Sequence, residues 1–204
     1  VIVTTNPSAL ARPALALSEV LATPVTPAVE LAIARLDPDA HSVYMLTSGS
    51  TSMPKAVIQT QRMLTTNVAQ ARQVLARTAG WSETMLDWLP WSHVSGACNQ
   101  FATLCSGGVF YIDGGRPMPG LFEESLENIR EIPQSFHINV PFGYAMLADA
   151  LEQDADLRQR FFGSLRIALY GGAGLPQALY ERFQRLAVDT IGERIFFTTG
   201  NRAT

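Results

Sequence analysis

The only lysine of the chain, Lys55, closes a segment that is rich in hydroxyl side chains, while the other 14 of its 15 cationic residues are arginines. The segment reads Leu46-Thr47-Ser48-Gly49-Ser50-Thr51-Ser52-Met53-Pro54-Lys55. Hydroxyl and backbone N–H donors can surround an anion, and the lysine ammonium adds a compact and movable positive charge. This chemistry suits phosphate. The alternative is a solvated turn with a surface lysine.

The spacing within this segment excludes a P-loop of the Walker type. That motif needs two glycines flanking four residues, followed directly by lysine and then by serine or threonine. Here Gly49 stands six positions before Lys55, and Ala56 follows the lysine. The chain is therefore not a P-loop nucleoside triphosphatase.

Three further segments combine aromatic, histidine, glycine and threonine residues in ways that suit a binding site. They read Trp88-Leu89-Pro90-Trp91-Ser92-His93, Tyr170-Gly171-Gly172-Ala173-Gly174-Leu175-Pro176, and Phe197-Thr198-Thr199-Gly200 followed by Ala203-Thr204. The glycines let backbone approach a flat ring closely, or they form a tight strand-to-helix turn and nothing more.

Together these segments resemble the signatures of adenylate-forming enzymes, the acyl-CoA synthetase and luciferase superfamily. The phosphate-binding signature of that family is matched at Thr47, Ser48, Gly49, Ser50, Thr51, Pro54 and Lys55. Ser52 and Ala56 stand where the family usually has glycine, and Asn201-Arg202 replaces its aromatic-glycine pair. The resemblance extends over nearly the whole chain, weakly before residue 40, with the signatures in the family's order.

The resemblance implies a role for each matched position. The phosphates of ATP would be held by Thr47, Ser48, Gly49, Ser50, Thr51 and Lys55, of which Thr51 and Lys55 would also stabilise the departing pyrophosphate. The adenylate would be bound by Gly171, Gly172, Ala173, Thr199, Gly200 and Thr204. The acid would contact His93, Phe142, Gly143 and Gly172. We expect no general base, because an ionised carboxylate attacks the α-phosphorus of ATP directly.

Within the superfamily, four segments are most similar to bacterial feruloyl-CoA synthetases: Trp88 to His93, Tyr111 to Gly115, Asn139 to Tyr144 and Gly172 to Pro176. The resemblance implies an ATP-dependent acid–CoA ligase that adenylates ferulate or a related aryl acid and passes the acyl group to CoA, with ATP, Mg²⁺ and CoA as its cofactors. Fatty-acid ligases and luciferase-like oxidases stay open, as does a non-catalytic nucleotide- or phosphate-binding module or degenerate homologue.

We expect the chain to be an excerpt of a longer protein, because it begins with Val1 and ends at Thr204, directly before the position of the family's Mg²⁺-binding glutamate. No metal ligand is therefore expected within the chain itself. The family's second lysine and ribose-binding aspartate are also missing, so the chain alone should be inactive. We place one division after residue 57, with residues 58–204 as a truncated α/β subdomain.

The elements that must position these residues alternate regularly. Hydrophobic patterns predict helices at about 14–21, 29–36, 59–79, 94–104, 121–129, 143–152, just before Phe161, and 177–187. They predict strands at 43–46, 85–89, 109–112, 136–140, 165–170 and 195–198. Strands separated by helices indicate an α/β fold with a parallel sheet flanked by helices on both faces.

The chemistry-bearing residues after residue 80 then fall just beyond the ends of predicted strands. In open α/β sheets, ligands bind in the crevice at the carboxyl ends of the strands. Ser92 is expected to cap the following helix, His41 and His137 to be structural, and Asp113 and Arg116 to be turn residues. Phe142, Gly143 and Tyr144 are expected to shape the acid pocket.

Composition narrows the class of protein. With 47% hydrophobic and 16% charged residues the chain reads as globular, and its net charge of −3 favours neither nucleic acid nor an anionic membrane as a partner. We predict a cytoplasmic location, with Cys98 and Cys105 as buried reduced thiols. The sequence does not indicate an oligomeric state.

Overall fold

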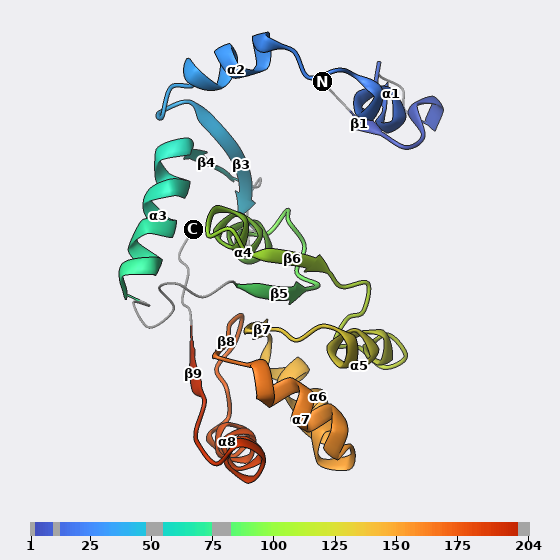
Figure 1. Ribbon diagram of the computed structural model, residues 1–204, viewed down its shortest axis with the longest axis vertical. Helices are drawn as coiled ribbons and strands as arrows, with labels where there is room; N and C mark the ends of the chain where they lie inside the picture. The colour runs from blue at the N-terminus through green and yellow to red at the C-terminus, as the bar shows by residue number, and fades with distance from the viewer. Residues whose placement is uncertain (1–2, 10–12, 48–54, 75–82, 200–204) are drawn as a thin grey trace. The chain divides into compact units, whose positions relative to one another are not determined.

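The structure is a computed structural model that describes residues 3–9, 13–47, 55–74 and 83–199 (Figure 1). The chain divides into two compact units, Val1–Ala40 and His41–Thr204. The first unit contains strands β1 (Val3–Thr4) and β2 (Leu15–Ala16), which pair in parallel, a 3₁₀ turn η1 (Pro7–Ala9), and helices α1 (Leu17–Ala22) and α2 (Pro27–Ala34). Neither α1 nor α2 buries a residue.

The second unit begins with an antiparallel pair of strands, β3 (His41–Thr47) and β4 (Lys55–Thr60), followed by helix α3 (Gln61–Val74). The strand predicted at 43–46 is confirmed. Strand β4 was not predicted, because a polar segment leads into it and its start, Lys55-Ala56, has no clear alternation. The division predicted after residue 57 falls inside β4.

A five-stranded parallel sheet forms the centre of this unit, in the order β6-β5-β7-β8-β9. Its strands are β5 (Thr84–Asp87), β6 (Val109–Ile112), β7 (Phe136–Asn139), β8 (Ile167–Tyr170) and β9 (Phe196–Thr199). The predicted parallel sheet is confirmed, with several strands shorter than expected. For β5 the reason is local, since Asp87 Oδ1 accepts a hydrogen bond from Leu89 N at 2.9 Å and turns the chain before Pro90.

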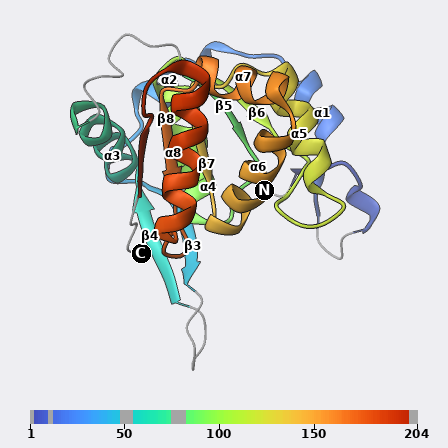
Figure 2. The same cartoon turned by 90° about the horizontal axis from the view of Figure 1, so that it is seen from below.

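Helices cover both faces of the sheet, as predicted. They are α4 (Val94–Cys105), α5 (Phe122–Glu131), α6 (Pro141–Gln153), α7 (Ala155–Ser164) and α8 (Gln177–Ile191). Helix α4 packs on the face to which Met85 and Asp87 point, through Thr103 and Asn99 respectively. Leu86 points to the opposite face, where α5 to α8 enclose the main core. Figure 2 shows α6 and α8 side by side across that face.

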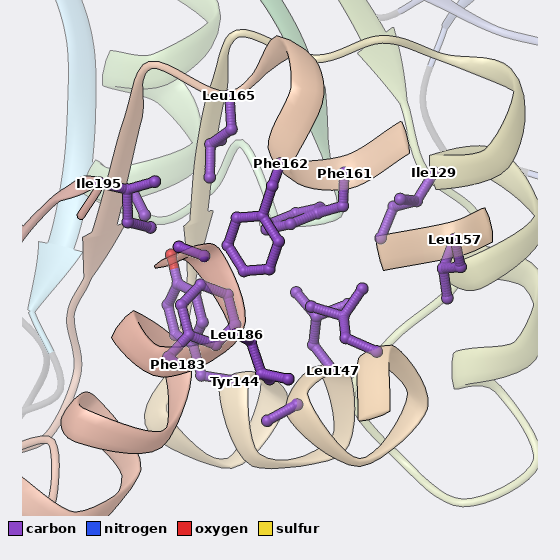
Figure 3. Close-up of a cluster of buried hydrophobic side chains, with 14 of the residues drawn as sticks. Ile129, Tyr144, Leu147, Leu157, Phe161, Phe162, Leu165, Phe183, Leu186 and Ile195 are labelled. Carbon is purple, nitrogen blue, oxygen red and sulfur yellow. The ribbon is translucent and has the colours of Figure 1, made fainter. Parts of the chain in front are cut away.

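The core is built from aromatic and aliphatic side chains of these helices, and Figure 3 shows its centre. Tyr144 and Phe183 are completely buried, and Phe161 and Phe162 nearly so. Their rings meet mostly edge to face at centroid distances of 5.1–5.9 Å. Each such pair contributes roughly 0.5–1.5 kcal/mol beyond the area it buries. This core fixes α6, α7 and α8 beneath β7 and β8.

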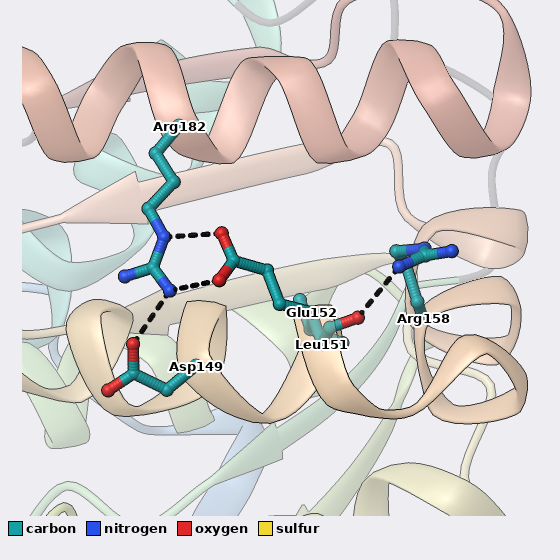
Figure 4. A network of polar contacts seen from close by, with 5 residues as sticks. All are labelled: Asp149, Leu151, Glu152, Arg158 and Arg182. Atoms are coloured by element: carbon teal, nitrogen blue, oxygen red, sulfur yellow. Dashed lines mark hydrogen bonds and ion pairs between the residues drawn. The ribbon is translucent and has the colours of Figure 1, made fainter.

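An arginine links α8 to α6 on the outside of the core (Figure 4). Arg182 makes a bidentate pair with Glu152 at 2.6 Å for both bonds and a further bond to Asp149 at 2.7 Å. On the neighbouring helix, Arg158 donates to the Leu151 carbonyl at 3.1 Å. The contacts are partly exposed, so they add orientation more than free energy.

The two cysteines correct one expectation. Both are free thiols on α4, but Cys98 is half-buried and Cys105 is exposed. Residue 105 is the last of its helix and is followed by Ser106-Gly107, where the chain leaves the sheet face. Among the described residues, no helix is both long and apolar enough to cross a bilayer.

Candidate active site

The parallel sheet gathers seven of the 15 predicted site residues at the carboxyl ends of its strands. Because all five strands are parallel, the residues that follow β5, β7, β8 and β9 emerge on the same side. The chain runs outward from β5 to β6 and then returns to the other side of β5 for β7. This reversal makes the gap between the ends of β5 and β7 a topological switch point, where open α/β sheets bind ligands.

The segment after β5 is held by a buried carboxylate and a helix that approaches it closely. Asp87 is 2% exposed, and its Oδ2 accepts from Asn99 Nδ2 on α4 at 3.0 Å. A Cβ at Gly96 would lie 2.6 Å from the Leu89 carbonyl oxygen and 2.5 Å from that of Pro90. Only glycine lets α4 sit this close to the loop, so Gly96 sets the position of the helix.

His93, which is exposed, begins α4 and is its N-cap in place of the expected Ser92. Its Nδ1 accepts from Ser95 N at 3.3 Å, so in the neutral ring the proton is on Nε2. The histidine satisfies one of the free N–H groups of the first helical turn, which is the function that had been expected of serine. Its Nε2–H can donate to an anionic group at the switch point.

The glycine segment after β8 forms an open turn. Gly171 N donates to the Asn139 carbonyl at 3.2 Å, and Gly172 has a φ of +82°, which residues with side chains rarely adopt. A Cβ at Gly172 would meet only Val140 Cγ1, at 3.6 Å. Ala173 and Gly174 are exposed. The turn thus presents bare backbone at the rim, as a site for a flat ring requires.

The residues at the start of α6 that were expected to shape the acid pocket differ in their exposure to solvent. Phe142 is 58% exposed at the rim. Gly143 is buried, and the space beside it is filled by Asn139, whose Oδ1 would lie 2.2 Å from an added Cβ. Tyr144 is wholly buried and donates to the Leu169 carbonyl at 2.7 Å, so the expectation that it lines the pocket is wrong. A helix has one inward face, and Tyr144 lies on it.

The ends of the other two strands carry a threonine and a carboxylate. Thr199 is exposed, and its hydroxyl donates to the Tyr170 carbonyl at 3.1 Å. Asp113 accepts from Gly115 N, Ser125 Oγ and Asn128 Nδ2 at 2.6–2.9 Å, which confirms it as a turn residue that ties β6 to α5. Of the remaining predicted adenylate contacts, Gly200 and Thr204 lie outside the described residues.

The hydroxyl-rich segment joins β3 to β4. Thr47 and Lys55 are register partners at the end of this pair that the segment 48–54 connects, so the backbones of the first and last predicted phosphate ligands lie side by side, and the Lys55 side chain is exposed. Ser48, Gly49, Ser50 and Thr51 lie outside the described residues. Because β3 and β4 form a sheet separate from the parallel one, the meeting of Lys55 and the Gly171 turn in one site stays a prediction.

An apolar cavity of about 150 Å³ lies between α3, α4 and the sheet. Met85, Phe136 and Leu169 line it from the sheet, with Val68 from α3 and Thr103 from α4. Its volume is about that of a known cavity that holds a benzene ring. Glu83 and Arg72 also line it. The pKa of Glu83 is raised because burial disfavours its charge, and the positive charge of Arg72 offsets part of this rise.

His137, expected to be structural, is buried at 5% exposure on β7. Its ring packs edge to face on Tyr144 and Phe161, and its Nδ1 bonds to Gln134 Oε1 at 2.9 Å. Burial lowers its pKa to about 4, against a smaller opposite effect of the Asp113 charge. The ring is therefore neutral at physiological pH, and His137 belongs to the core.

Two buried residues of the edge were missed as site residues, Asp87 and Asn139. The signal was present in both cases: each lies within a predicted strand, two or three residues before a proline, where Asp and Asn side chains commonly bond backbone N–H groups. As for Mg²⁺, the described residues contain no cluster of three or more His, Cys, Asp or Glu suited to a metal.

Comparison with known proteins shows the family of the chain. The model of the family described as AMP-binding enzyme matches residues 4–194. The chain belongs to this family. The chain is 27% identical over 143 residues to a long-chain-fatty-acid–CoA ligase of Thermus thermophilus, a match that covers 70% of the chain and 25% of the ligase. It is 31% identical over 137 residues to a carboxylic acid reductase of Mycobacterium marinum, covering 64% of the chain and 11% of the reductase.

Solved structures share the fold of this chain. A malonyl-CoA ligase, in a ternary product complex with methylmalonyl-CoA and AMP, superposes with a TM-score of 0.64 at 20% identity, covering 97% of the chain and 43% of the ligase. O-succinylbenzoate coenzyme A synthetase from Bacillus subtilis, in complex with AMP, gives 0.61 at 22% identity over 84% of the chain and 33% of the synthetase. The chain therefore spans a quarter or less of the two relatives and less than half of these structures.

Proposed function

We propose that this chain supplies the phosphate-binding and acid-binding parts of an ATP-dependent acid–CoA ligase. The observation that carries the proposal is the switch-point edge of the sheet, where His93, Phe142 and the bare turn at Gly172 follow the carboxyl ends of the neighbouring strands β5, β7 and β8. The register pairing of Thr47 with Lys55 supports a separate anion-binding element. Family membership supports a nucleotide as the anion.

The proposed reaction has two steps. The acid carboxylate attacks the α-phosphorus of ATP, a P–O bond to pyrophosphate breaks, and acyl-adenylate forms. The thiol of CoA then attacks the acyl carbon, loses its proton and releases AMP. Residues 47–51 and Lys55 would hold the β- and γ-phosphates and neutralise the charge that develops on pyrophosphate. His93 Nε2–H and the Gly171–Gly174 backbone would orient the carboxylate and the adenylate.

We propose an aryl acid, ferulate or a close relative, as the substrate. Phe142 offers an exposed ring at the rim, and the cavity under α4 has the volume of an aromatic ring between apolar walls. The polar residues Thr103 and Asn99 also line that cavity and would suit a phenolic hydroxyl. A medium-chain alkyl group is the competing occupant, because the sheet side of the cavity is apolar.

The test is ATP–pyrophosphate exchange by the full-length protein that carries this chain, with ferulate, coumarate, benzoate and a medium-chain fatty acid as separate substrates. We expect exchange that depends on the acid and is fastest with the hydroxylated aryl acids. Faster exchange with the fatty acid would overturn the aryl assignment. Exchange with none of the acids, together with tight binding of ATP or pyrophosphate, would favour the second candidate, a nucleotide-binding module. Ser52 and Ala56, which replace family glycines, favour that candidate.

The same assay tests the prediction that residues 1–204 alone are inactive. We expect this chain to give exchange at background level with every acid, because the family's second lysine and ribose-binding aspartate are not in its sequence. Robust exchange by the isolated chain would contradict that prediction.

A further inference from the structure

The two strands that border the switch point, β5 and β7, pair over a very short length. Strands β5 and β7 pair through the single register match of Met85 with Phe136. Continuing that register by three residues places Trp88 opposite Asn139, at the carboxyl ends of both strands. The bond between these two side chains therefore closes the sheet at the mouth of the candidate site.

Asn139 forms this bond with Trp88 and makes two further hydrogen bonds. Its Oδ1 accepts from Trp88 Nε1 at 3.3 Å and from Val140 N at 2.9 Å, and its carbonyl accepts from Gly171 N at 3.2 Å. One residue thus contacts the segments that follow three adjacent strands, β5, β7 and β8. With 3% of its surface exposed, Asn139 has little freedom to move.

Two features fix the orientation of the carboxamide. Both partners of Oδ1 are N–H donors, so the oxygen must face them and the amide nitrogen must face away. Gly143 leaves the space that the carboxamide fills, since a Cβ there would lie 2.2 Å from Oδ1 and 2.7 Å from Nδ2. The glycine and the asparagine are matched, and a side chain at 143 would displace Asn139.

We propose that Asn139 is a positioning residue that sets the distance between the Trp88–His93 segment and the Gly171–Gly174 turn. It need not touch a ligand. It acts through Trp88 on the loop that leads to His93, and through Gly171 on the turn. The proposal rests on the function given above, in which His93 orients the acid and the turn holds the adenylate.

The kinetic test uses Asn139→Leu and Asn139→Asp in the full-length protein. Leucine keeps the branched shape of asparagine but has no acceptor, whereas aspartate keeps an acceptor oxygen in the place of Oδ1 and lies just before the N-terminus of α6, where negative charge is favourable. We expect Asn139→Leu to raise the KM for the acid about tenfold. Asn139→Asp should stay within about threefold of the wild type. A fall in kcat with unchanged KM in both variants would mean that Asn139 only stabilises the fold.

A double-mutant cycle tests the match with Gly143. Gly143→Ala alone should displace the carboxamide and raise the KM for the acid, whereas the same change in an Asn139→Ala background meets no carboxamide and should have a much smaller effect. Additive effects of the two changes would contradict the proposal, because residues that do not interact give additive effects.

An NMR measurement on the full chain separates this proposal from the proposed function. With glycine and tryptophan labelled with ¹⁵N, Asn139→Leu should shift the Trp88 indole N–H and the Gly171 and Gly172 amides, while Gly163, on α7, serves as the unaffected reference. Unmoved Gly171 and Gly172 resonances would overturn the positioning role. If the wild type adenylates no acid, the proposed function fails, and these shifts still decide whether Asn139 couples the two segments.

Discussion

Three buried side chains shape the loops of the carboxyl edge in the same way. Asp87, Asp113 and Asn139 are 2%, 8% and 3% exposed, and each stands at the end of its strand or just after it. Each accepts a hydrogen bond from a backbone N–H one or two residues further on. This local bond competes with the strand ladder and turns the chain out of the sheet. These hydrogen bonds therefore fix the position of the first residues of each loop.

His137 gives the chain a predictable response to acid. Burial lowers its pKa to about 4, whereas in the unfolded chain the pKa is about 6.5. Below pH 6.5 the unfolded state binds a proton that the folded state does not, so stability falls as the pH drops toward 4 and this effect then levels off. Between pH 7 and pH 5 the loss should be about 2 kcal/mol.

Urea unfolding of His137→Gln at these two pH values measures this loss, with His41→Gln as the matched control because His41 is exposed. We expect His137→Gln to reduce the difference in unfolding free energy between pH 7 and pH 5, and His41→Gln to leave it nearly unchanged. An unchanged difference in His137→Gln would show that His137 is not the group that titrates.

At the scale of elements, the sequence predicted helices and strands better than it predicted contacts between distant segments. The alternation of apolar strands with amphipathic helices predicted the parallel sheet and its flanking helices, because the spacing of apolar residues along the sequence indicates which face of each element is buried. It did not predict β4, nor that His93 would replace Ser92 as the cap of α4. The bond between Trp88 and Asn139 spans 51 residues of sequence, and no local pattern encodes a contact of that range.

Two helical glycines give a matched test of the close approach of α4. In Gly96→Ala the new Cβ would lie within 2.6 Å of two carbonyl oxygens, so the helix must move, and we expect a loss of about 1–3 kcal/mol. In Gly163→Ala on α7 the nearest atom is Gln159 Nε2 at 3.6 Å, and helix propensity should stabilise the fold by up to about 1 kcal/mol.

Chemical unfolding of both variants measures these changes. The account predicts opposite signs for the two substitutions, with the Gly96→Ala variant also weaker in binding at the His93 side of the site. Equal and favourable effects would mean that α4 does not pack on the Leu89 and Pro90 carbonyls.

At the scale of the whole molecule, the two units contribute unequally to stability. Among the described residues every buried hydrophobic side chain lies between Met45 and Phe197, and α1 and α2 of the first unit bury none. We therefore expect that removal of residues 1–40 leaves the urea midpoint of the second unit nearly unchanged. A large fall in that midpoint would show that the first unit stabilises the second.

The central claim is that the Thr47–Lys55 segment holds the pyrophosphate that leaves during adenylation of an acid. Its most direct test is acid-dependent ATP–pyrophosphate exchange by the full-length protein with Lys55→Gln, beside Lys55→Arg and the wild type. Loss of one charge-assisted bond of about 1.5–3 kcal/mol predicts exchange slower by roughly 10- to 100-fold in Lys55→Gln, with partial recovery in Lys55→Arg. Exchange by Lys55→Gln within about twofold of the wild type would contradict the account, since it corresponds to under about 0.5 kcal/mol.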